Sequence, residues 1–162
     1  PLVLGGGQEN GLRPGTENLQ GAVAFAAAAE AAQAGLTERL ALARSLEARL
    51  IGGLATMGAL PLPLGRQAGD GRYSPWIVSA AFPGLSGEVL VRALSDKGIA
   101  VSTGSACAAN QGKKGRRVLE AMGLAEDLGL ASIRISFGPV TTMADIDLFL
   151  ETAASLWRQF RT

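Results

Sequence analysis

The chain has 162 residues, of which 48% are hydrophobic and 18% are charged, and its formal net charge is +1. This length and composition predict a globular chain with a core of its own, and they exclude a chain that is disordered throughout. The small net charge gives no sign of a nucleic-acid partner or of an acidic membrane surface, and no apolar run is long enough to span a membrane.

Two residue counts limit the possible chemistry. The chain contains no histidine and a single cysteine, Cys107. Without an imidazole, serine or cysteine catalysis that uses a local histidine base is excluded, as are zinc sites that need histidine, so we predict no metal site. A single cysteine forms no internal disulfide and no signal peptide is evident, which together predict a free thiol and a cytoplasmic protein.

The first residues predict a loop that belongs to a larger assembly. Residues 1–4 have no initiator methionine and no preceding element to pair with, so we interpret the start as the cut end of a longer protein. Residues 5–18, GGGQENGLRPGTEN, contain five glycines and a proline. This composition predicts a loop whose backbone lies close to a ligand or a neighbouring chain.

Two helical stretches follow the loop. Asn18 is placed to cap an alanine-rich helix at residues 19–34, whose small side chains permit close packing, so we expect this helix to be largely buried. Leucines and alanines at helical spacing continue through residues 36–50, and the pair Gly52 and Gly53 predicts the end of this second stretch.

The rest of the chain alternates predicted strands and helices. Strands are predicted at residues 59–64, 76–82, 99–103 and 132–137, and helices after Ser86, at residues 116–122 and after Thr142. Thr142 and Asp145 have the spacing of a capping box, and an apolar stripe follows them. This alternation predicts an α+β (α/β-like) fold in which helices pack on one face of a small three- to four-stranded sheet.

The segment STGSAC at residues 102–107 is the strongest candidate for chemistry. A predicted strand leads there into a loop of small residues that cannot bury a thiol deeply, so we expect Cys107 to be accessible. Residues 113–117 carry four cationic side chains, which favour the thiolate, the nucleophilic form of cysteine. From these residues alone a second interpretation stays open, in which Cys107 is a small hydrophobic residue and the cations form a solvated turn.

Four segments together resemble the pyridoxal-phosphate-dependent cysteine desulfurases of the NifS/IscS-like class, within the class V aminotransferase family. They are GGGQENGLRPGTEN, LSGEVLVRALSDKGIAVSTGSAC, RRVLEAMG and SIRISFGPVTTMADID, in the order and approximate spacing of the family. The resemblance covers nearly the whole chain. It implies the small C-terminal domain of a fold-type I enzyme at residues 19–162, including the long connecting helix, with residues 1–18 as a loop from the cofactor domain.

The resemblance implies roles for three residues. Cys107 matches the cysteine that takes the sulfur of the substrate L-cysteine as a persulfide, so that alanine leaves. Arg134 matches the arginine that binds the substrate carboxylate, a task that suits the planar guanidinium group; a surface arginine paired with a carboxylate is the alternative. Thr16 matches the residue that reaches the phosphate of pyridoxal phosphate in the other subunit of a homodimer, and helix capping is its alternative.

The resemblance also implies parts that this sequence does not contain. The lysine that binds the cofactor lies upstream of the glycine-rich loop in the family, and none of Lys97, Lys113 and Lys114 matches it. We therefore expect the chain alone to be inactive and not to bind pyridoxal phosphate. Pro14 and Trp76 are small departures within otherwise matching segments.

Several functions remain open beyond this point. In the intact enzyme, Cys107 would pass its sulfur to an acceptor protein such as an iron–sulfur scaffold or a thiolation partner, with residues 113–117 helping to dock it. A selenocysteine lyase or a cysteine-sulfinate desulfinase from related branches is an alternative. A different class of function is a noncatalytic dimerisation or partner-binding module, or a persulfide carrier loaded by another protein.

Overall fold

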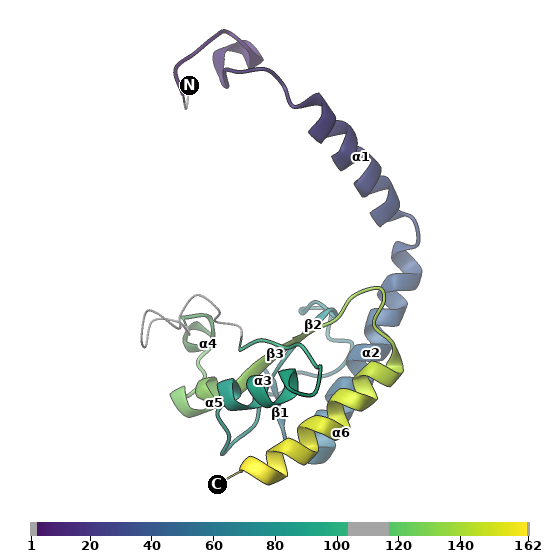
Figure 1. Ribbon diagram of the computed structural model, residues 1–162, viewed down its shortest axis with the longest axis vertical. Helices are drawn as coiled ribbons and strands as arrows, with labels where there is room; N and C mark the ends of the chain where they lie inside the picture. The colour runs from purple at the N-terminus through teal and green to yellow at the C-terminus, as the bar shows by residue number, and fades with distance from the viewer. Residues whose placement is uncertain (1–2, 104–116, 162) are drawn as a thin grey trace. The chain divides into compact units, whose positions relative to one another are not determined.

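The computed structural model describes residues 3–103 and 117–161 and divides the chain into two compact units, Pro1–Thr37 and Glu38–Thr162 (Figure 1). The first unit contains a short 3₁₀ turn, η1 (Glu9–Gly11), and helix α1 (Leu19–Gln33). The Asn18 side chain accepts a hydrogen bond of 2.9 Å from the Gly21 N–H, which confirms the predicted cap and start of this helix.

The predicted burial of α1 is wrong for this chain. None of its residues is buried, and the Phe25 side chain is 76% exposed. Among the described residues of its unit, η1 is the other helical element, and a turn of this length cannot cover a helix of 15 residues. Alanine side chains also carry little apolar area to bury, so the helix is held by its backbone hydrogen bonds and its cap.

The second unit combines helices with one antiparallel sheet. The sheet has three strands in the order β1-β2-β3, and both strand pairs are antiparallel, which confirms the predicted α+β class. Its elements in chain order are α2 (Leu36–Met57), β1 (Leu60–Leu62), β2 (Ile77–Ala81), α3 (Gly87–Ser95), α4 (Arg117–Ala121), α5 (Glu126–Leu130), β3 (Ser132–Ser136) and α6 (Met143–Phe160).

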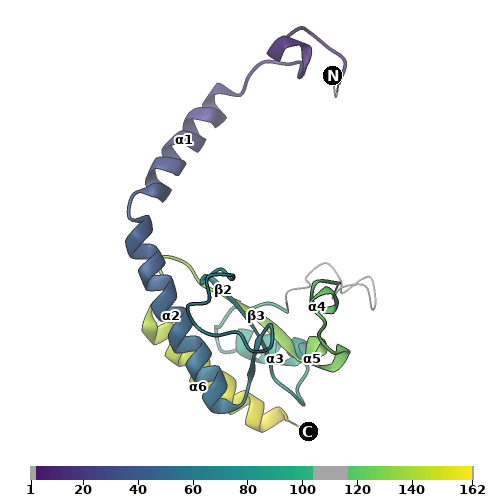
Figure 2. The same ribbon diagram turned by 180° about the vertical axis from the view of Figure 1, so that it is seen from behind.

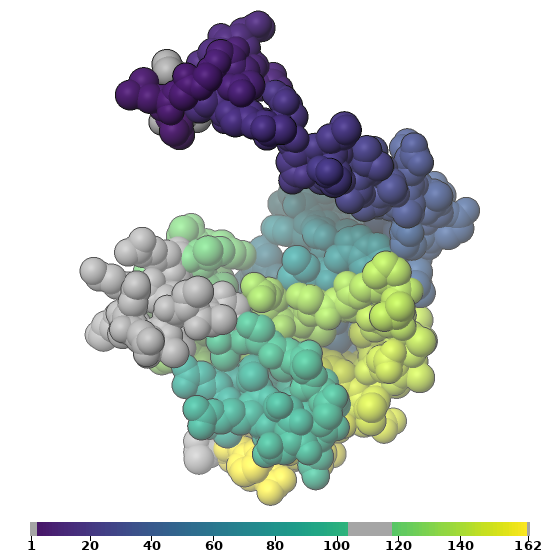
Figure 3. Space-filling model, turned by 45° about the horizontal axis from the view of Figure 1, so that its top comes forward, coloured from purple at the N-terminus to yellow at the C-terminus, as the bar shows by residue number. Residues whose placement is uncertain are grey.

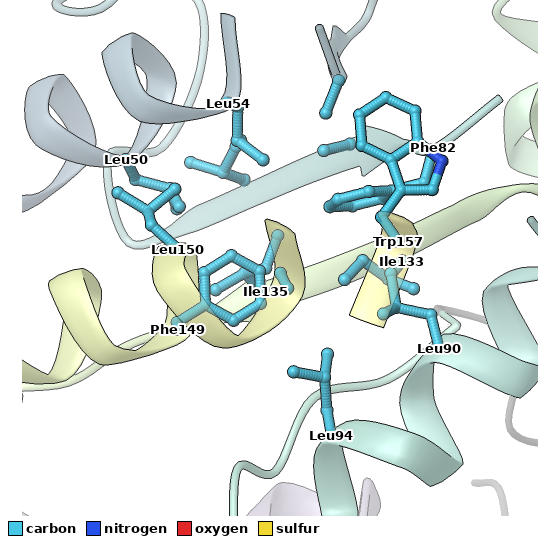
Figure 4. Packing of buried hydrophobic residues seen from close by; sticks show 14 of the residues in the cluster. Leu50, Leu54, Phe82, Leu90, Leu94, Ile133, Ile135, Phe149, Leu150 and Trp157 are labelled. Carbon is cyan, nitrogen blue, oxygen red and sulfur yellow. The ribbon is translucent and has the colours of Figure 1, made fainter. Parts of the chain in front are cut away.

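One face of the sheet is covered by helices, as predicted. Alternate residues of the two longer strands enter a single hydrophobic cluster with side chains from α2, α3 and α6 (Figure 4). Phe82 and Trp157 meet edge to face at 5.3 Å between ring centroids, and the Trp157 indole N–H donates to the Pro83 carbonyl. Helices α3 and α6 lie side by side on the surface of this layer (Figure 3). The strand residues in the cluster are Val78, Ala80, Ile133 and Ile135.

Helix α2 continues past the predicted stop at Gly52 and Gly53 and ends at Met57. The reason is the crossing of α2 over α6, which both ribbon views show (Figures 1 and 2). A Cβ atom added at Gly53 would lie 2.3 Å from Leu150 Cδ1, so the missing side chain of Gly53 is what allows this approach. An ion pair of 2.7 Å between Arg49 and Asp147 joins the same two helices.

The predicted strand at residues 99–103 is also wrong within the described part of the chain. The structure shows there one isolated bridge, between Ser102 and Arg134. After α3, Gly98 has φ +78° and the Ile99 N–H bonds to the Leu94 carbonyl at 2.9 Å. This is the pattern of a glycine-closed helix end, so the helix cap takes up the first amide of the expected strand.

Three further helix predictions have different outcomes. The capping box of Thr142 and Asp145 at the start of α6 is confirmed. Ser86 does stand at the N-cap of α3, but its side chain makes no capping hydrogen bond. Helix α4 confirms the predicted helix at residues 116–122 with a difference of one residue at each end, whereas α5 was not predicted.

A buried ion pair fixes the long connection between β1 and β2. Arg66 Nη2 donates to Glu47 Oε1 of α2 at 2.6 Å, and both side chains are at least 95% buried. The same guanidinium donates to the carbonyls of Ser74 and Ile77, and the Gly69 N–H donates to the second oxygen of Glu47. The connection is therefore ordered around one charged pair.

Among the helices that the structure describes, none has the length and hydropathy that a transmembrane span requires.

Candidate functional site

Arg134 lies on the face of the sheet that no helix of residues 3–103 and 117–161 covers. Along β3, Ile133 and Ile135 point into the core whereas Arg134 and Ser136 are exposed. This is the alternation of a strand with one buried face, and it places the guanidinium group of Arg134 on the open face. The sequence predicted this strand, and the structure confirms it.

Two serines lie directly opposite Arg134, one on each side. Ser79 of β2 is its register partner, and Ser102 is its partner in the isolated bridge. The Ser102 N–H donates to the Arg134 carbonyl at 3.1 Å, and the Arg134 N–H donates to the Ser102 carbonyl. Because directly opposite residues of an antiparallel pair share a face, all three side chains stand on the open face of the sheet.

No carboxylate of residues 3–103 and 117–161 lies within ion-pair distance of the Arg134 guanidinium. In that part of the chain, the sequence-based alternative of a surface arginine paired with a carboxylate is therefore wrong. An exposed guanidinium without a carboxylate partner is suited to binding an anion from outside the chain, since its planar donors match both oxygens of a carboxylate.

Cys107 lies outside the described residues, so its predicted accessibility stays a prediction. The described chain stops at Thr103 and resumes at residue 117. What the structure does place is the segment that leads to Cys107, because Ser102 is hydrogen-bonded to the backbone of Arg134. Two of the sequence-predicted features are thus brought together: Arg134 and the base of the cysteine-bearing segment.

Thr16 belongs to the first unit, and it is exposed in the loop before α1. The N-cap of α1 is Asn18, so the alternative interpretation of Thr16 as the helix cap is wrong. Arg13 Nη1 donates to the carbonyl oxygens of Gly15 at 2.9 Å and of Thr16 at 3.4 Å. Gly15 has φ +99°, a conformation that favours glycine, so the loop turns sharply just before the threonine.

These loop residues fit the phosphate of a cofactor such as pyridoxal phosphate. The Thr16 hydroxyl has no side-chain hydrogen-bond partner among the described residues, and the Arg13 cation is held beside it. A free hydroxyl next to a guanidinium is a suitable donor set for a phosphate. One of the three lysines, Lys97, lies within the described residues. It is exposed just after α3 and does not belong to this loop.

Sequence reasoning missed the neighbours of Arg134 and the Glu47–Arg66 pair. Ser79 lies in a predicted strand, but its position opposite Arg134 depends on the register of two strands that are 50 residues apart in the chain. The alternation of polar and apolar residues predicts on which face of the sheet Ser79 lies, but it does not predict which residue of the neighbouring strand lies opposite it. Nothing in the sequence around Arg66 distinguished it from a surface arginine.

Comparisons with known proteins identify the family of the chain. The model of the family described as aminotransferase class-V matches residues 6–149. The IscS-like cysteine desulfurase of Mycobacterium tuberculosis is 38% identical over 157 residues, which are 93% of this chain and 38% of that protein. Cysteine desulfurase IscS of Methanosarcina thermophila is 35% identical over 164 residues, which are 99% of this chain and 39% of that protein.

Solved structures give the same result. A NifS-like protein superposes with a TM-score of 0.77 at 35% identity, covering 98% of this chain and 39% of that one. A NifS-like protein from Rickettsia africae superposes with a TM-score of 0.75 at 25% identity, covering 98% and 40% of the two chains. The chain thus spans about two fifths of the length of these relatives, and over that span it belongs to the aminotransferase class-V family.

Proposed function

We propose that a protein containing this chain is a pyridoxal-phosphate-dependent cysteine desulfurase. The observation that carries the proposal is the exposed Arg134, which has no carboxylate partner in the described chain and is hydrogen-bonded to the segment that leads to Cys107. A reaction on an amino acid uses a group that binds the substrate carboxylate, and the exposed guanidinium of Arg134 is suited to that task. Family membership and the names of the relatives support the same assignment.

In this proposal three residues of the chain have roles in binding and catalysis. Arg134 binds the carboxylate of L-cysteine and orients its side chain. The Cys107 thiolate attacks the substrate sulfur, so that a sulfur–sulfur bond forms as the carbon–sulfur bond breaks, and the persulfide stays on Cys107 while alanine leaves. Thr16 donates to the cofactor phosphate of the other subunit in a homodimer. Pyridoxal phosphate, when bound, supplies the electron sink for the pair from the breaking bond.

The wider setting is part of the same proposal. Residues 1–18 act with the cofactor domain, and residues 19–162 form the small domain. The persulfide passes in the cytoplasm to an acceptor protein of iron–sulfur cluster assembly or of a thiolation pathway, which docks at the basic residues 113–117. We expect the 162-residue chain by itself to be inactive, since none of its three lysines matches the lysine that binds the cofactor in the family.

Single-turnover sulfur transfer tests the assignment. The chain and a version extended to the length of the relatives are mixed with pyridoxal phosphate and L-cysteine, and the mass of the peptide that contains Cys107 is followed. We expect one added sulfur atom in the extended protein, none in the short chain, and none in an extended Cys107→Ser control. The same gain in the short chain would contradict the expected inactivity. No gain in either protein would favour the noncatalytic module.

The role of Arg134 has a matched control in the chain. Arg92 of α3 is also exposed, and no ion pair of its side chain is found in the described residues. Replacing Arg134 by alanine removes a charged hydrogen-bonding partner of the substrate, so KM for L-cysteine should rise by about tenfold or more. Arg92→Ala should leave KM unchanged. Equal effects of the two changes on KM would contradict a role of Arg134 in binding the substrate.

A further inference from the structure

Ser79 and Arg134 are closer neighbours than the register alone indicates. The backbone N–H and C=O of Arg134 both point to Ser102. On the side of β2, the Phe137 N–H donates to the Trp76 carbonyl, and the Phe82 N–H donates to the Ala131 carbonyl. Hydrogen-bonded and non-hydrogen-bonded residue pairs alternate along an antiparallel ladder, and Arg134 lies an odd number of residues from both Phe137 and Ala131. Ser79 and Arg134 are therefore a non-hydrogen-bonded pair, the type in which opposite side chains lie closest together.

Both members of this pair carry donors without a partner. In the part of the chain that the structure describes, no hydrogen bond or ion pair occupies the Ser79 hydroxyl or the Arg134 guanidinium. Both side chains stand on the open face of the sheet, and Ser79 is half-buried there whereas Arg134 is exposed. Partial burial makes a hydroxyl a more effective donor, since fewer waters compete for its hydrogen bond.

We propose that the Ser79 hydroxyl is a second donor to the substrate carboxylate that Arg134 binds. This proposal rests on the proposed function and adds a specificity-determining residue to it. A carboxylate accepts about four hydrogen bonds, and the two parallel N–H groups of a guanidinium fork occupy only part of that capacity. The Ser79 hydroxyl, directly opposite Arg134, can donate a hydrogen bond to one of the remaining acceptor positions of the carboxylate. The pair then selects for ligands that carry a carboxylate.

The test measures ligand binding, so it does not depend on turnover. The protein extended to the length of its relatives and loaded with pyridoxal phosphate is titrated with L-alanine and with ethylamine, its counterpart without the carboxylate, while the cofactor absorbance is followed. Loss of one hydrogen bond to the ionised carboxylate should raise Kd for L-alanine about tenfold or more in Ser79→Ala. Kd for ethylamine should not change, and Ser79→Thr, which keeps the hydroxyl, should bind L-alanine like the parent protein.

Ser136 provides the matched control. It is the same residue type on the same open face, two residues along β3 from Arg134, but it lies opposite Ile77. Ser136→Ala should leave both dissociation constants unchanged. Because Ser79 and Arg134 contact one ligand group, the loss in the double variant Ser79→Ala, Arg134→Ala should be smaller than the product of the two single losses.

The outcomes separate this inference from the proposed function. An unchanged Kd for L-alanine in Ser79→Ala, an equal rise for both ligands, or no binding of L-alanine to the parent protein would each overturn the role of Ser79. A Ser79-dependent Kd in a protein that releases no sulfur from L-cysteine would support the carboxylate site while contradicting desulfurase activity.

Discussion

The two adjacent glycines of α2 allow a sharp test of how this helix packs. Both have helical conformations, but only Gly53 faces α6. A Cβ atom at Gly52 would have no heavy atom within 4 Å, whereas one at Gly53 would lie 2.3 Å from Leu150 Cδ1 and 2.7 Å from its Cδ2. The same substitution at neighbouring positions therefore separates the intrinsic helix preference from the packing.

The magnitudes follow from these distances. Alanine is favoured over glycine in a helix by about 1 kcal/mol, so Gly52→Ala should stabilise the chain by about 0.5–1 kcal/mol. Gly53→Ala gains the same preference but must displace the buried Leu150 side chain, and overpacking of this kind costs about 1–3 kcal/mol. The free energies of unfolding of the two variants should therefore differ by about 1–3 kcal/mol, with Gly52→Ala the more stable.

Urea unfolding of both variants, followed by tryptophan fluorescence, measures this difference. A second change checks the cause: in a Leu150→Ala background the added Cβ atom has room, so Gly53→Ala should no longer destabilise the chain. Equal stabilities of Gly52→Ala and Gly53→Ala in the parent chain would refute the explanation of why α2 passes through two glycines.

Three other predictions concern single contacts. Glu47→Ala leaves the buried Arg66 cation unpaired and should destabilise the chain by about 3–5 kcal/mol in urea unfolding. Glu47→Leu combined with Arg66→Met should recover only part of the loss, because three backbone groups then lose their side-chain partners. Gly87→Ala should destabilise α3 by about 1–3 kcal/mol in the same assay, because its Cβ atom would lie 2.3 Å from the Ser132 carbonyl oxygen. Hydrogen bonds from the Thr142 backbone N–H and hydroxyl hold the pKa of Asp145 below its usual value of 3.8, so the capping box stabilises α6 at neutral pH and this contribution is lost as the pH falls through the lowered pKa. Asp145→Asn should therefore be less stable than the parent chain at pH 7 and should approach it at acid pH in thermal unfolding curves; an equal difference at all pH values would argue against this cause.

The sequence predicted the features that depend on local patterns. The caps at Asn18 and Thr142, the strand around Arg134 and the covered face of the sheet all follow from residue types within a few positions of one another. Such patterns act through backbone conformation and side-chain alternation, which a single segment contains in full.

The misplaced end of α2 and the missed neighbour of Arg134 both depend on contacts between distant segments. Gly52 and Gly53 looked like a helix end because glycine commonly closes helices with a positive φ, but that conformation occurs later, at Gly58, with φ +88°. The choice between these positions depends on Leu150, which lies almost a hundred residues away. The same holds for the candidate site, where Ser79 meets Arg134 only through strand register.

The buried ion pair also decides where a protease can act on the connection between β1 and β2. Both arginines of this connection are potential trypsin sites, but the Arg66 side chain is 5% exposed and that of Arg72 is 77% exposed. A protease must draw the scissile segment into its own cleft, which at Arg66 means breaking the bond to Glu47 first. Native chain should thus be cut within this connection after Arg72, and cleavage after Arg66 would report that the connection has come away from α2.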